Sequence, residues 1–185
     1  MAYNKFKKLE ILRRELGIKD IMRKWLPQEI KSYTTISSLL KESLDEASYE
    51  SLTTEKAKSE SIISPIIKEL RRKNPAKFSF FSGFEFNVDA SKNLKGYCDY
   101  VLSADTERGE ITSPVFALVE AKDGEIDKGY AQCGAEMYAA QIFNEREGNP
   151  KKNIYGCVTN ATSIQIIFRL LLQNRIGFWA FCNGF

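Results

Sequence analysis

The chain has 185 residues, 43% of them hydrophobic and 28% charged, a composition typical of one globular domain with its own core. It contains no histidine, which excludes Ser–His and Cys–His nucleophiles, histidine bases and most zinc sites. There is no run of about 18 apolar residues, which excludes a membrane span, and no apolar leader at the N-terminus. We therefore expect a cytoplasmic protein that has no membrane partner. The cysteines lack zinc-finger or redox spacing and are expected to be reduced core thiols: Cys98, Cys133, Cys157 and Cys182.

The first third of the chain has the spacing of amphipathic helices. Residues 3–50 are expected to form two or three short helices, interrupted at Gly17 and Pro27. A further helix is expected over residues 55–73, with Ile63, Ile67 and Leu70 on its apolar face. Pro65 either kinks this helix or lies in its first turn, and the sequence leaves both interpretations open.

The rest of the chain alternates between strand and helix signals. Apolar and aromatic runs predict five strands, and a segment rich in alanine and glycine predicts a long helix between the third and fourth of them. The expected strands cover residues 78–88, 97–103, 115–119, 153–158 and 164–172, and the expected helix covers residues 126–146. Residues 176–185 are apolar and are expected to form a last strand or to pack against a partner subunit. We predict an α/β fold with an N-terminal helical extension over residues 1–54 and a core domain over residues 55–185.

Three polar residues at strand positions indicate chemistry. Glu120 and Lys122 end an apolar strand, where alternation places both side chains on one face. Asp99 lies within another strand, a position in which aspartate is rare. If the two strands pair, Asp99 and Glu120 converge, and two carboxylates with a backbone carbonyl are ligands that Mg²⁺ or Mn²⁺ prefers. The alternatives are that Asp99 is a strand-end residue hydrogen-bonded to a turn and that Glu120 and Lys122 form a surface ion pair.

Two further residues are candidate accessories of this site. On a continuous helix Glu60 follows the apolar stripe toward the core, where it could reach a metal or its water. Gln132, early in the long helix, could hydrogen-bond a phosphate or a base. Both residues could equally be structural, Glu60 as a solvated helix residue. The helix expected over residues 55–73 ends in a basic cluster, which consists of Lys68, Arg71, Arg72 and Lys73. This cluster and Lys128 could contact phosphates or could form solvated helix faces.

At Asp99 and at Glu120-Ala121-Lys122 the chain resembles the PD-(D/E)XK nuclease superfamily, and distantly the nuclease domains of type I restriction subunits. The resemblance covers about residues 55–172 and implies a restriction-endonuclease-like αβββαβ core, with a mixed central sheet flanked by helices. It implies that Asp99, Glu120 and the Ala121 carbonyl bind Mg²⁺. It also implies that Lys122 acts on the attacking water and on the scissile phosphate, and that Glu60 and Gln132 are accessory residues of the site. The expected function is Mg²⁺-dependent hydrolysis of DNA, with a homodimer suited to cutting two strands. The alternative is an inactive nucleic-acid-binding or assembly module.

Overall fold

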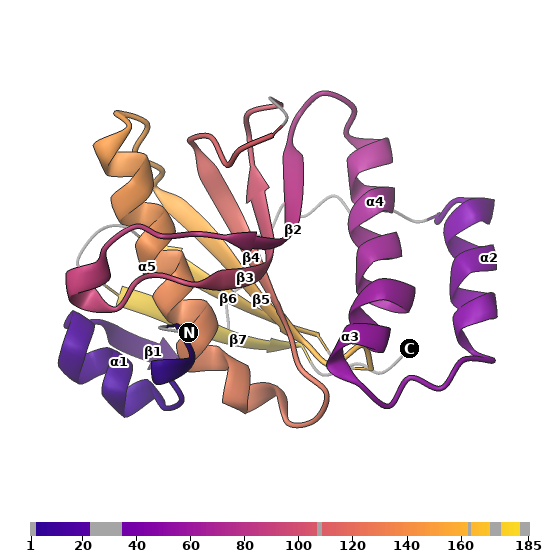
Figure 1. The fold of residues 1–185 in the computed structure, drawn as a ribbon, viewed down its shortest axis with the longest axis horizontal. Coiled ribbons are helices and arrows are strands. Elements are labelled where there is room, and N and C mark those ends of the chain that lie inside the picture. The colour runs from indigo at the N-terminus through magenta and orange to yellow at the C-terminus, as the bar shows by residue number, and fades with distance from the viewer. Residues whose placement is uncertain (1–2, 23–34, 107–108, 163, 171–174, 182–185) are drawn as a thin grey trace.

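The computed structural model is an α/β fold built on one mixed sheet with helices on both faces (Figure 1). It describes residues 3–22, 35–106, 109–162, 164–170 and 175–181, and the side chains of residues 3–19, 35–106 and 109–162. The strand order in the seven-stranded sheet is β1-β7-β6-β5-β4-β3-β2, with parallel pairing between β4 and β5 and between β1 and β7. The strands are β1 (Lys19–Met22), β2 (Ser79–Glu85), β3 (Tyr97–Ser103), β4 (Val115–Ala121), β5 (Asn153–Thr159), β6 (Ile164–Leu170) and β7 (Arg175–Phe181).

The helices form a layer on each face of the sheet. α1 and α5 lie on one face, while α3 and α4 lie on the other, with α2 packed outside α4 (Figure 1). The α-helices are α1 (Leu9–Leu16), α2 (Ser38–Ala47), α3 (Glu55–Lys58), α4 (Ser64–Lys73) and α5 (Tyr130–Arg146). Shorter 3₁₀ turns are η1 (Tyr3–Lys5), η3 (Ala90–Lys92) and η4 (Ile126–Gly129), and η2 (Ser59–Ile63) is a π-helical turn. In the described part of the chain, no helix is both long enough and apolar enough to cross a membrane.

Among the described side chains, two apolar clusters lie between the sheet and these layers. The larger one lies under α5, whose small residues such as Ala135 and Ala139 let the helix approach the strands closely. The smaller one joins α4 to β3 and β4 through Ile63, Ile67 and Tyr100. Cys98 on β3, Cys133 on α5 and Cys157 on β5 are free thiols. Cys182 lies outside the described residues.

The elements from residue 55 onward confirm the predicted order of helices and strands, and β7 adds the expected last strand. The N-terminal region differs, because residues 19–22 form a strand, β1, that pairs with β7. The side chains of Tyr3, Phe6 and Leu12 also belong to the cluster under α5. The N-terminal residues thus share a core with α5.

The helix predicted over residues 55–73 exists, but it contains a wide turn. Thr54 caps its start by accepting a hydrogen bond from the Ala57 amide at 3.1 Å. At η2 the Ser64 amide donates to the Ser59 carbonyl, five residues back, which is a π-helical bond. Pro65 follows at once, and because it has no amide hydrogen it cannot donate the next bond of a regular α-helix. Pro65 thus lies in the first turn of α4, one of the two positions that the sequence left open.

α2 is tied to α4 by a buried carboxylate. Glu69 accepts from the Ser37 amide at 3.0 Å and from the Ser37 hydroxyl at 2.7 Å, at the N-terminus of α2. Arg72 and Lys73 pair with the same carboxylate at 2.9 and 3.5 Å. The Ser37 hydroxyl is the main cause that lowers the pKa of Glu69 to about 2, with Arg72, the Ser37 amide and Lys73 adding to it.

We predict that Glu69→Gln destabilises the protein in a pH-dependent way. Because the pKa of Glu69 is lower in the folded state, its carboxylate stabilises the fold fully above the ordinary pKa of 4.5 and loses this effect as the pH falls toward 2. Urea unfolding at pH 7, 4, 3 and 2 should show a gap between wild type and Glu69→Gln that narrows with acid. A gap of constant size over this range would contradict the assignment.

Candidate functional site

Asp99 and Glu120 meet because β3 and β4 are antiparallel neighbours. Their ladder pairs Tyr100 with Val119, which leaves Asp99 and Glu120 side by side at the end of the ladder. There the Asp99 carboxylate accepts a hydrogen bond from the Ala121 amide at 2.8 Å. The partner is the last residue of the neighbouring strand and not a turn, as the alternative interpretation of Asp99 had it. It also fixes one oxygen of Asp99 next to the backbone of the Glu-x-Lys segment.

Glu120 is a buried acid, with 1% of its side chain exposed. The Lys122 ammonium hydrogen-bonds its Oε1 atom, so the pair exists, but it is not a surface pair. The Oε2 atom of Glu120 is also buried and has no hydrogen-bond partner among the described residues. A buried ionised oxygen without a partner is costly, so this atom needs a proton, a water molecule or a cation.

Lys122 is held from two sides. Its ammonium lies 3.7 Å from the Glu55 carboxylate of α3, in addition to its bond with Glu120. The stem of the side chain runs over Gly129, where an added Cβ would stand 3.3 Å from Lys122 Cγ and 2.5 Å from Val158 Cγ1. The absence of a side chain at Gly129 therefore leaves room above all for Val158, and also for the stem of Lys122.

The electrostatics of this group are dominated by burial and by an excess of acids. Burial, followed by the charge of Asp99, raises the pKa of Glu120 to about 8. Burial also raises the pKa of Asp99 and of Glu55 against the lowering effect of Lys122. Burial by itself would lower the pKa of Lys122, but Glu120, Glu55 and Asp99 outweigh it and raise it. The Lys122 ammonium thus interacts with the charges of three carboxylates, those of Glu120, Glu55 and Asp99.

The structure does not place Glu60 with these acids, which corrects the expectation that it faces the core. Its side chain is 68% exposed and pairs with Lys56 at 3.8 Å. In a continuous α-helix Glu60 would lie on the apolar face, whereas the π turn takes up about one extra residue and rotates the preceding part by about 100°. Glu55, five residues earlier, consequently lies where Glu60 was predicted.

Gln132 reaches the site indirectly, through a buried acid on its own helix. Its side-chain amide donates to Glu136 Oε1 at 3.2 Å. Glu136 is fully buried, and its Oε2 atom has no partner among the described residues. Burial, then the charges of Glu120 and Asp99, raise the pKa of Glu136 well above its usual range. Glu136 is therefore a fourth carboxyl group under the pair from β3 and β4.

The sequence contained weak signals for the two acids that it did not single out. Glu55 follows the capping residue Thr54, where acids are common for the helix dipole alone. Glu136 stands in a run of small and apolar residues, and a lone acid in such a run indicates burial. That signal was available, but nothing in the sequence connected Glu136 to β3 and β4.

In the part of the chain that the structure describes, no group of three or more acidic or cysteine side chains is arranged to hold a metal ion. Comparison of the chain with protein-family models, curated proteins and solved structures finds no match. The geometry of these side chains is therefore the guide to function.

The basic residues predicted to contact nucleic acid have mixed surroundings. Arg72 and Lys73 pair with Glu69, and Lys73 also donates to the Thr35 carbonyl at 2.7 Å. Lys128 pairs with Glu125 at 3.2 Å, with both side chains about 70% exposed. Lys68 is exposed and Arg71 is half-buried. Two of the four residues at the end of α4 thus have a structural role in fixing α2.

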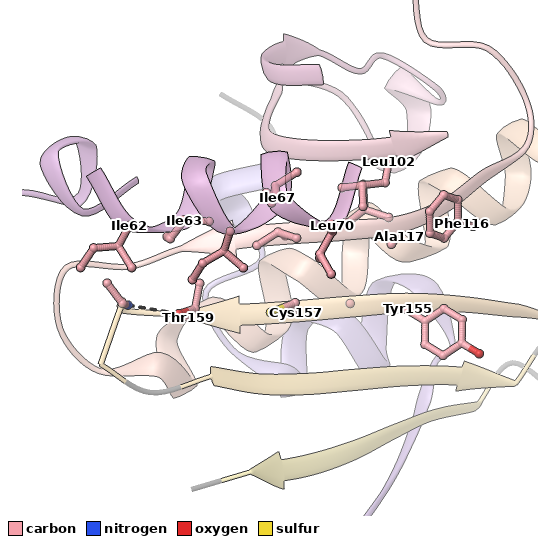
Figure 2. Close-up of a pocket in the computed structure, with 15 residues that line it drawn as sticks. Ile62, Ile63, Ile67, Leu70, Leu102, Phe116, Ala117, Tyr155, Cys157 and Thr159 are labelled. Carbon is pink, nitrogen blue, oxygen red and sulfur yellow. Dashed lines mark hydrogen bonds between the residues drawn. The ribbon is translucent and has the colours of Figure 1, made fainter. Parts of the chain in front are cut away.

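A cavity of about 470 Å³ lies between the sheet and the helix formed by η2 and α4 (Figure 2). Figure 2 shows Ile63, Ile67 and Leu70 of the helix facing strand residues such as Phe116 and Tyr155. The lining is almost wholly apolar and includes none of Glu55, Asp99, Glu120 or Lys122.

Proposed function

We propose that the protein is a Mg²⁺-dependent nuclease that hydrolyses phosphodiester bonds in DNA. The observation that carries the proposal is the meeting of Asp99 and Glu120 at the end of one strand pair, with the Lys122 ammonium on Glu120. The mixed sheet flanked by helices supports the resemblance to the PD-(D/E)XK superfamily. The restriction-endonuclease-like fold, the catalytic roles and the DNA substrate are parts of this proposal.

The donor set fits a hard divalent cation. Two carboxylates and the Ala121 carbonyl offer oxygen ligands, and Mg²⁺ binds through few protein oxygens while retaining several waters. Such an open site differs from a closed cluster of three or more side chains. The unpartnered Oε2 atom of Glu120 and the surplus of acids around Lys122 both favour added positive charge.

Each residue has a defined task in this scheme. When bound, Mg²⁺ would polarise the phosphate and favour ionisation of the attacking water. Asp99 keeps its orientation through the Ala121 amide, so one carboxylate is preorganised. Lys122 places a positive charge beside Glu120, where it stabilises charge that develops on the phosphate. Glu55 fixes that ammonium from the helix side.

The test is metal-dependent cleavage by the purified full chain. We expect plasmid DNA to be nicked or linearised with Mg²⁺ or Mn²⁺ and to stay intact with a chelator. Calorimetry with Mn²⁺ alone should detect uptake of the cation without DNA. Absence of cleavage of DNA and RNA, together with absence of cation uptake, would overturn the proposal. Ultracentrifugation with and without DNA would show whether the chain acts as a homodimer.

One observation favours the alternative of an inactive nucleic-acid-binding module. The Lys122 ammonium already occupies Oε1 of Glu120, one of the oxygens that would bind the cation. Under this alternative, DNA would be retained without being cut, and retention would weaken steeply with salt. The same plasmid experiment, run with a gel-shift assay at two salt concentrations, distinguishes the two functions.

A further inference from the structure

The π turn before α4 determines which acid of this helix faces Lys122. In a regular α-helix the Ser59 carbonyl would accept from residue 63, whereas here it accepts from the Ser64 amide. The extra residue in the turn rotates α3 against α4 by about 100°. With this rotation Glu55 lies 3.7 Å from the Lys122 ammonium, while Glu60 points to solvent and pairs with Lys56.

The carbonyl that closes the π turn has a second partner, the phenol of Tyr100. The Tyr100 hydroxyl donates to the Ser59 carbonyl at 3.0 Å and contacts the Ser59 hydroxyl at 2.8 Å. Tyr100 is 1% exposed and lies on β3, next to Asp99. A buried strand residue therefore holds Ser59, the first residue of the π turn.

We infer that Tyr100 is a positioning residue, which stabilises the π turn through Ser59 and thereby directs Glu55 at Lys122. Its consequence for catalysis rests on the proposed nuclease function, but the position of Glu55 does not. Apart from the Glu55–Lys122 contact, α3 is also held by a hydrogen bond from the Lys58 ammonium to the Asp123 carbonyl after β4. Loss of the Tyr100 hydroxyl should therefore allow α3 to rotate relative to α4, while α3 stays attached to the rest of the protein.

The first test measures the position of Glu55 by zero-length carbodiimide cross-linking, which joins a carboxylate to an amine in contact with it. We expect Tyr100→Phe to reduce the Glu55–Lys122 cross-link about fivefold, because two hydrogen bonds that fix the turn are lost. The Lys56–Glu60 cross-link is the internal reference, because residues four apart stay close in either helix form. Tyr3→Phe is the matched control, since it removes another hydroxyl from a residue 1% exposed, one that bonds the Phe86 carbonyl at 2.8 Å.

A Glu55–Lys122 yield in Tyr100→Phe within twofold of wild type, relative to Lys56–Glu60, would overturn the inference. If Tyr100→Phe does not fold, Ser59→Ala decides the question, because it removes only the contact with the Ser59 hydroxyl and should give a smaller loss in the same direction. Unchanged cross-linking in a folded Ser59→Ala would then overturn it.

The second test uses cleavage and separates this inference from the proposed function. Tyr100→Phe and Glu55→Gln should each lower the cleavage rate about tenfold, and the double variant should be no slower than Glu55→Gln alone. Additive losses would show that Tyr100 acts other than through Glu55 and would overturn the inference. If wild type cleaves nothing, the proposed function fails, while the cross-linking result still decides the position of Glu55.

Discussion

Replacing Lys122 by methionine is expected to lower the rate of Mg²⁺-dependent cleavage by about a hundredfold to a thousandfold. Methionine keeps an unbranched stem against Gly129 and removes only the ammonium. The fold should tolerate the change, because Glu120 can take up a proton, which burial and Asp99 already favour by raising its pKa to about 8. Cleavage rates and urea unfolding of the same preparations measure the two effects separately.

Two further variants sharpen this prediction. Lys56→Met is the control, since Lys56 is 83% exposed and pairs only with the exposed Glu60 among the contacts described. It should cleave within about twofold of wild type, as expected for a surface change. Asp99→Asn should lose cleavage and Mn²⁺ uptake yet remain folded, because its amide oxygen can still accept from Ala121. A Lys122→Met protein that cleaves at the wild-type rate would show that the ammonium has only a structural role.

Replacing Asn144 by leucine is expected to lower the free energy of unfolding by about 3 kcal/mol, because two buried backbone groups lose their partners. Asn144 lies on α5 and is fully buried. Its side chain accepts from the Val115 amide at 2.8 Å and donates to the Val115 carbonyl at 2.6 Å. It therefore satisfies the first residue of β4 as a neighbouring strand would, and it fixes α5 on the strand that ends in Glu120.

Asn149→Leu serves as the control for Asn144→Leu. Asn149 is exposed just beyond α5, and its side chain makes one long hydrogen bond, of 3.4 Å, to the Glu147 carbonyl. Its substitution should change the unfolding free energy by less than about 0.5 kcal/mol. Denaturant titrations followed by tryptophan fluorescence give both values. Equal losses in the two variants would show that the bond between α5 and β4 contributes little.

The sheet core could be predicted from the sequence because its signals are local. Strands such as residues 97–103 and 115–121 carry β-branched and aromatic runs, and Gly and Pro separate them from their neighbours. The strand at residues 19–22 could not be predicted in this way. It is four residues long, and its pairing with β7 comes from the opposite end of the chain.

The positions of site residues on strands could be predicted from the alternation of side chains. The positions of site residues on the helix could not, because they depend on the rotation of the helix about its axis. Alternation along β4 correctly placed Glu120 and Lys122 on one face, and strand pairing brought Asp99 to them. Glu60 was misplaced because a single π turn, which has no sequence signature of its own beyond the proline that follows it, changed the phase of the helix. Glu136 was missed because its neighbours are distant in sequence.

The pairing of β1 with β7 also constrains how the chain can fold. During synthesis Lys19 leaves the ribosome long before Arg175, its partner in the sheet, has been made. β1 therefore cannot pair in the sheet until β7 has been synthesised. Contacts between such distant segments are slow to form. A chain shortened before residue 175 would leave both β1 and β6 with an open edge, a surface that promotes aggregation.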